Sequence, residues 1–80
     1  MITRQQVKMA RAALGWGVRE LASAAGVTAN TVSRFENGAD AYGETLGKIE
    51  RALEAAGIVF IPEGQPSPDG GAGVRLKAGA

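Results

Sequence analysis

Apolar residues recur every three or four positions in the first part of the chain, a spacing that predicts short amphipathic helices. The first helix is expected to start after Thr3, because Gln6 three residues later completes a capping box with it. Its inner face runs from Val7 to Leu14 at helical spacing. Gly15 then predicts a left-handed C-cap that ends the helix.

The same spacing predicts three further helices. A short helix over residues 18–25 is followed by Gly26, which permits a sharp turn. The next runs from Ala29 to Glu36 behind Thr28, which is an N-cap residue type. The last runs from Glu44 to Ala56, with an apolar stripe along one side.

The pattern changes after the fourth helix. Residues 58–61 are β-branched or aromatic and predict a strand, and residues 74–77 alternate apolar and basic side chains, which predicts a second one. A Pro- and Gly-rich loop separates them. The sequence therefore predicts a mainly α fold, with four helices in a domain of residues 1–57 and a two-stranded β element with a tail over residues 58–80.

Both faces of the first predicted strand are apolar, so both need cover. A two-stranded hairpin is marginal in water, and its long connection is unusual for a hairpin. Pairing with the same element of a second copy would give a four-stranded sheet, so we expect a homodimer. The alternative is a hairpin folded back on the chain's own fourth helix. The residues expected to hold the dimer are the apolar residues of the two strands: Ile58, Val59, Phe60, Ile61, Val74 and Leu76.

Composition removes most enzyme chemistry from this chain of 80 residues, which has no His and no Cys. Thiolate and imidazole metal sites, Ser-His-Asp catalysis and Cys-His catalysis are therefore excluded. The Gly-rich run of residues 70–73 precedes a strand rather than a helix, unlike a nucleotide-binding loop. We expect no enzyme activity, no metal, no cofactor and no small-molecule ligand.

Charge is distributed unevenly along the chain. Residues 1–38 carry five basic and two acidic side chains, whereas residues 39–57 carry two basic and four acidic ones. The basic excess points to a polyanion on the N-terminal side. The chain shows neither an apolar signal core nor a run long enough to span a membrane, so we expect a soluble, cytoplasmic protein with no membrane partner.

Two short helices joined by a Gly-containing turn are typical of a helix-turn-helix. The second of them can be anchored by Val32 and Phe35, which leaves a small polar face turned outward. Such a helix fits the DNA major groove, where side chains near its N-terminus meet base edges. The candidates for base contacts on this face are Ala29, Asn30, Ser33 and Arg34.

Four segments at these spacings, Arg11–Trp16, Arg19–Ala22, Ala25–Thr28 and Thr31–Gly38, resemble the Xre family, the lambda-repressor-like helix-turn-helix regulators of bacteria and phages. The resemblance covers about residues 4–57. The C-terminal part resembles a small single-domain bacterial branch of that family.

The resemblance implies that Asn30 takes an adenine and Arg34 a guanine, while Ala29, often a Gln in the family, offers only a methyl contact. Where the family usually has a polar cap followed by Gln, this chain has Gly17 and Val18, so only backbone N–H groups can meet phosphate there. Affinity per monomer should then be weak and dimerisation more important. The candidate phosphate contacts are Gly17, Val18, Arg19, Thr28, Asn37 and Tyr42.

For the other notable residues, the sequence allows both a functional and a purely structural role. By resemblance, Arg11 and Glu36 form an ion pair between the first and third helices, and the alternative is two solvated charges. Trp16 is expected in the core rather than stacked on a base, and Tyr42 either touches the DNA backbone or is a plain surface residue. The basic residues Arg4, Lys8 and Arg19 either contact phosphate or are simply solvated.

The sequence therefore predicts a sequence-specific transcriptional regulator, a repressor, associated with the nucleoid. It would bind double-stranded DNA at a pseudo-palindromic operator as a homodimer, through the helix of residues 29–36. The alternative is an antitoxin or a protein-binding adaptor of the same fold, with a toxin or another protein docked on its C-terminal β edge.

Overall fold

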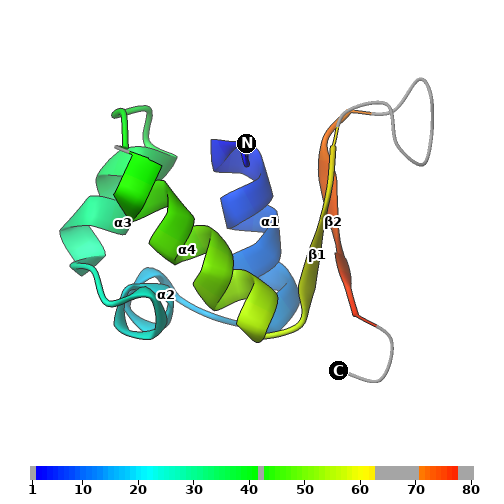
Figure 1. Cartoon of the computed structure of the whole chain (residues 1–80). Coiled ribbons are helices and arrows are strands. Elements are labelled where there is room, and N and C mark those ends of the chain that lie inside the picture. Colours follow the sequence, from blue (N-terminus) through cyan, green and yellow to red (C-terminus); the bar gives the residue numbers. More distant parts are fainter. Residues whose placement is uncertain (1, 42, 63–70, 78–80) are drawn as a thin grey trace.

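The computed structural model describes residues 2–41, 43–62 and 71–77. Over these residues the chain forms four helices followed by an antiparallel β-hairpin (Figure 1), so the predicted mainly α architecture is confirmed. The elements are α1 (Arg4–Leu14), α2 (Val18–Ala25), α3 (Ala29–Glu36), α4 (Gly43–Ala55), β1 (Ile58–Ile61) and β2 (Gly73–Leu76).

The predicted ends of α1 are confirmed by its caps. The Thr3 hydroxyl accepts a hydrogen bond from the Gln6 amide at 3.1 Å, and the Gln6 side-chain oxygen accepts one from the Thr3 amide at 2.9 Å. Gly15 ends the helix with φ of 68°, a left-handed conformation that favours glycine. Gly26 ends α2 in the same way, with φ of 72°.

The core lies where the four helices meet. Its largest fully buried side chains come from all four of them. The inner face of the hairpin extends this core, because Ile58 is buried and Phe60 and Val74 pack against the same cluster. The fully buried side chains are Val7, Leu21, Val32, Ile49 and Leu53.

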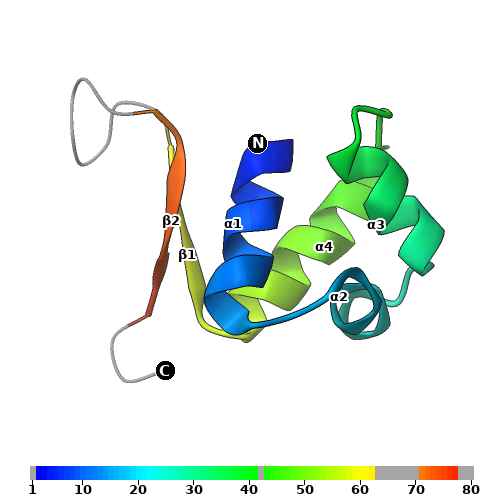
Figure 2. The same cartoon turned by 180° about the vertical axis from the view of Figure 1, so that it is seen from behind.

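The two strands pair within the chain, with Ile58 opposite Leu76 and Ile61 opposite Gly73. The hairpin folds back on its own chain, as in the alternative stated above, but it lies beside α1 as well as the end of α4 (Figure 2), and the packing on α1 was not predicted. This packing covers only the inner face. Val59 and Ile61 on the outer face stay half-buried, so pairing with a second copy remains a prediction.

The Gln6 side chain ties the hairpin to α1. Its Nε2 atom donates to the Ile61 carbonyl at 3.1 Å and to the Gly73 carbonyl at 2.9 Å. With the Thr3 bond, the oxygen and both N–H groups of this buried amide are all used. Gln6, which completes the capping box of α1, therefore also fixes the start of β2 against the end of β1.

Candidate nucleic-acid interface

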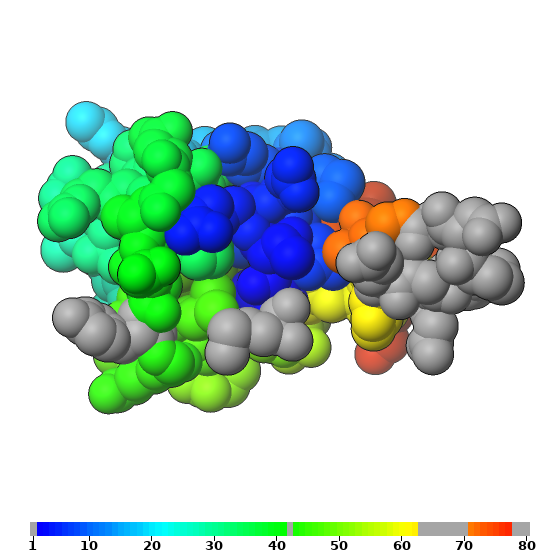
Figure 3. Space-filling view, turned by 90° about the horizontal axis from the view of Figure 1, so that it is seen from above, coloured from blue at the N-terminus to red at the C-terminus, as the bar shows by residue number. Residues whose placement is uncertain are grey.

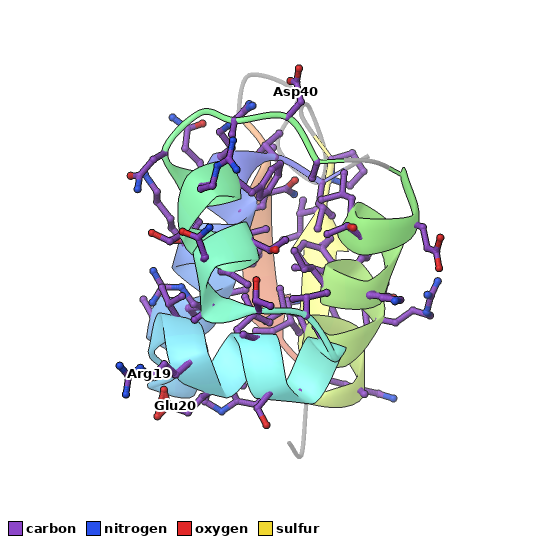
Figure 4. All side chains as sticks on the ribbon, turned by 90° about the vertical axis from the view of Figure 1, so that its left-hand side faces the viewer. Arg19, Glu20 and Asp40 are labelled. Atoms are coloured by element: carbon purple, nitrogen blue, oxygen red, sulfur yellow. The ribbon has the colours of Figure 1, made fainter. Side chains whose placement is uncertain are left out.

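The helices α2 and α3 form the helix-turn-helix unit at one end of the molecule. The amide of Val27 donates to the Ala22 carbonyl at 3.0 Å, which closes the turn around Gly26. Thr28 then caps α3, as predicted, because its hydroxyl accepts from the Thr31 amide at 3.1 Å. Figure 4 views this end of the molecule, with α3 upright in front and α2 running across below it.

The helix α3 is fixed to the core by its inner side. Val32, Phe35 and Glu36 are buried along it. Asn30 and Arg34 are exposed, and their spacing of four residues places them on the same side of the helix. The helix therefore presents an amide and a guanidinium outward from a rigid base.

The exposed face of α3 is narrower than the sequence predicts. Ala29 and Ser33 are half-buried, and the Ala29 methyl packs against the core cluster. The reason is the helical period, which puts Ala29 and Ser33 in line with the buried Val32 and Glu36. These two residues lie at the edge of the exposed face rather than in its middle.

A groove of about 350 Å³ runs beside the exposed face of α3. The segment from α3 to α4 forms its other wall. Two of the lining residues, Asn30 and Arg34, are predicted by the sequence; the others are not, because only the packing of this segment against α3 brings them together. The groove is lined by Asn30, Thr31, Arg34, Ala39, Asp40, Ala41 and Thr45.

The start of α2 carries three of the candidate phosphate contacts. Gly17 and Arg19 are exposed and Val18 is half-buried, packed against the core. The carboxylate of Glu20 accepts a hydrogen bond from the Gly17 amide at 2.9 Å, and Figure 4 shows Glu20 beside Arg19 at this corner. The negative side chain of Glu20 therefore already accepts from one of the backbone N–H groups that we expected to meet phosphate.

The remaining phosphate candidates lie at the two ends of α3. Thr28 is exposed at its start and Asn37 is exposed at its end. Tyr42 lies outside the described residues. Of the basic residues considered for phosphate, Lys8 is exposed on α1, whereas Arg4 is bonded to the segment between α3 and α4.

Arg11 and Glu36 form a two-bond ion pair between α1 and α3. The Nε and Nη2 atoms of Arg11 each donate to a different Glu36 oxygen at 2.7 Å, and Nη1 donates to the Trp16 carbonyl at 3.1 Å. The side chains are only 20% and 5% exposed. The hydrogen bonds that Arg11 donates to the Glu36 carboxylate raise the pKa of Arg11 above its usual range, although burial opposes this. Trp16 itself is half-buried against the core, as expected.

Over the described residues, no helix is long and apolar enough to cross a membrane.

Comparison with known proteins identifies the fold. No curated protein matches the chain. A family model described as helix-turn-helix matches residues 7–56, which is more than half of the 80 residues. The chain therefore belongs to the Xre, lambda-repressor-like helix-turn-helix family, a family of DNA-binding regulators rather than of enzymes.

Proposed function

We propose that this protein is a sequence-specific DNA-binding repressor that inserts α3 into the major groove. The observation that carries the proposal is the exposed pair of Asn30 and Arg34 on a helix locked to the core. An Asn amide can bond adenine N6 and N7, and an Arg guanidinium can bond guanine O6 and N7. Each such contact is worth about 1–3 kcal/mol of discrimination against a wrong base.

Phosphate contacts would set the position of α3 in the groove. The amides at the start of α2 other than that of Gly17, together with the Arg19 side chain, can meet one strand of the DNA backbone. Thr28 and Asn37 are exposed at the two ends of α3, and Tyr42 follows five residues after Asn37 in the sequence. These contacts would fix the register but carry no sequence information.

We further propose that the protein acts as a homodimer through its hairpin. The hairpin and α3 lie at opposite ends of the molecule, with α1 and α4 between them (Figure 1), and β2 has one edge without a partner strand among the described residues. A two-fold axis directed from the hairpin toward α3 would join two such edges. Both recognition helices would then face the same side, as two major grooves about 34 Å apart require.

The experiment that tests this function is selection of bound duplexes from a random DNA library with the purified protein, at a stated near-physiological salt concentration. We expect an enriched sequence with two symmetric half-sites. Asn30→Ala and Arg34→Ala should each relax the preference at one base pair, whereas Arg51→Ala, which changes an exposed Arg on α4, should not. Enrichment that is unaffected by either α3 substitution would contradict the assignment.

One observation favours a second candidate, a protein-binding adaptor or antitoxin. Leu76 is 47% exposed at the end of β2, and Val59 and Ile61 are half-buried on the outer face of the hairpin. A strand of a partner protein could pair with the open edge of β2. A chain that enriches no DNA sequence but forms a stoichiometric complex with a host protein would favour this candidate over the first.

A further inference from the structure

Arg4, at the first position of α1, joins this helix to the segment between α3 and α4. Its Nη2 atom donates to the Gly38 carbonyl at 2.9 Å and to the Ala39 carbonyl at 3.2 Å. The centre of its guanidinium lies 5.2 Å from the centroid of the Phe35 ring, and Nη2 lies 3.8 Å from an Asp40 oxygen. Seen from above, the blue start of the chain lies against the green segment (Figure 3).

The bonded carbonyls belong to a segment that is otherwise held mainly by the end of α3. The amides of Gly38 and Ala39 donate back to Phe35 and Arg34, at 3.2 and 2.9 Å. Gly38 turns the chain with φ of 110°. Beyond it, residues 39–41 form a wall of the groove beside α3. The Arg4 contacts therefore fix where this wall stands relative to α3.

We infer that Arg4 is a positioning residue for DNA binding: it holds the segment after α3 so that Asn37 and the groove wall meet the DNA backbone. This inference rests on the proposed function. The Nη2 atom of Arg4 already donates to two carbonyls and is not available to phosphate. Its Nε atom is buried and has no acceptor among the described residues.

The contacts of Arg4 with the Phe35 ring and the two carbonyls require an arginine, and another positively charged side chain would not make them. A planar guanidinium can stack over an aromatic ring while its edge donates to backbone carbonyls, whereas the compact ammonium of lysine cannot do both from one position. Arg4→Lys therefore keeps the positive charge but removes the planar set of N–H donors. If Arg4 acts by its charge alone, this substitution should not change DNA affinity; if it acts by holding the segment, the affinity should fall.

The test is a double-mutant cycle on DNA affinity, using the duplex selected by the wild-type chain. We expect Arg4→Lys to weaken binding about fivefold or more, and to have about twofold or less effect in an Asn37→Ala background, because the two substitutions disturb the same contact. The control is Arg51→Lys, the same exchange at an exposed position on α4, which should leave affinity unchanged. Circular dichroism establishes the folded fraction of each variant, and affinity is expressed per folded molecule.

Arg4→Gln provides a second readout through salt dependence. A residue that neutralises a phosphate contributes about 0.9 to the slope of log affinity against log salt, whereas a positioning residue contributes none. We expect Arg4→Gln to weaken binding with the slope unchanged. The inference is overturned if Arg4→Lys binds as tightly as the wild type, if its loss persists with Asn37→Ala, or if the slope falls by about 0.9. Failure of the wild-type chain to bind any selected duplex would instead overturn the proposed function.

Discussion

Replacing Arg11 with methionine should destabilise the fold by about 3 kcal/mol, because the substitution leaves the Glu36 carboxylate buried without its partner. In the wild-type chain both oxygens of this carboxylate accept hydrogen bonds of 2.7 Å from Arg11. Breaking a buried ion pair from one side typically costs about 3–5 kcal/mol. The lower end applies here because the Arg11 side chain is 20% exposed, so water can reach that side of the pair.

The assay is thermal and urea denaturation followed by circular dichroism. For a domain of this size, a loss of 1 kcal/mol lowers Tm by about 4–8 °C, so Arg11→Met should lower it by about 12 °C or more. Arg34→Met is the matched control, because it removes an exposed Arg from α3 and should change stability by about 0.5 kcal/mol or less. A cost below about 1 kcal/mol for Arg11→Met, the value for an exposed pair, would refute the reasoning.

Two further measurements test whether the loss of stability comes from the unpaired charge of Glu36 rather than from lost packing of the Arg11 side chain. The double variant Arg11→Met, Glu36→Leu should recover most of the loss, since no buried charge then remains unpaired. The raised pKa of Arg11 means that the pair's contribution is complete below the usual arginine pKa and is lost only as pH rises through the higher folded value. The charge of Arg11 should therefore contribute in full at both about pH 6 and about pH 9. A cost of Arg11→Met that is smaller at about pH 9 than at about pH 6 would contradict this account.

Three other predictions concern the start of α2, the hairpin and a helix end. Glu20→Gln keeps an acceptor for the Gly17 amide but removes a negative charge from the expected phosphate site. DNA affinity should therefore rise about threefold at low salt, and this gain should shrink as the salt concentration rises. Gln6→Leu leaves the Thr3 amide and two hairpin carbonyls without this partner; urea denaturation should show a loss of about 2–3 kcal/mol, and an unchanged midpoint would contradict the role of Gln6. Gly15→Ala forces φ of 68° on a residue with a Cβ and should cost about 1 kcal/mol in thermal denaturation, whereas Gly43→Ala, in open space at the start of α4, should cost nothing.

The helix ends were predictable because their signals are local. The Thr3 and Gln6 box uses side chains three residues apart, and the left-handed Gly15 follows directly after the last turn. Where the local signal was weaker, the bounds moved by one residue. The fourth helix starts at Gly43 rather than Glu44 and ends at Ala55, and the second strand starts at Gly73 rather than Val74. A small residue at such a boundary fits either state, so only the tertiary contacts decide it.

The facing of α3 shows the limit of reading a short helix by period alone. Two anchor residues, Val32 and Phe35, fix the inner side but not the width of the buried stripe. Glu36 widens this stripe, since its ion pair buries a charged side chain that a hydrophobic pattern counts as outward. Ala29, about two turns earlier on the same side of the helix, is half-buried against the core cluster. The position of Arg11 on another helix decides the burial of Glu36, and no spacing within α3 records it.

The first turn of α1 links the two ends of the molecule that the sequence divides into separate parts. Arg4 bonds the segment after α3, and Gln6 bonds both strands of the hairpin, across 34 to 67 residues of chain. Both residues precede position 7, where the family match begins. The helix-turn-helix match accordingly accounts for the recognition helix but not for these contacts. A shift of this turn would disturb the segment after α3 and the hairpin together, so we expect the two parts divided at residue 57 to move as one body.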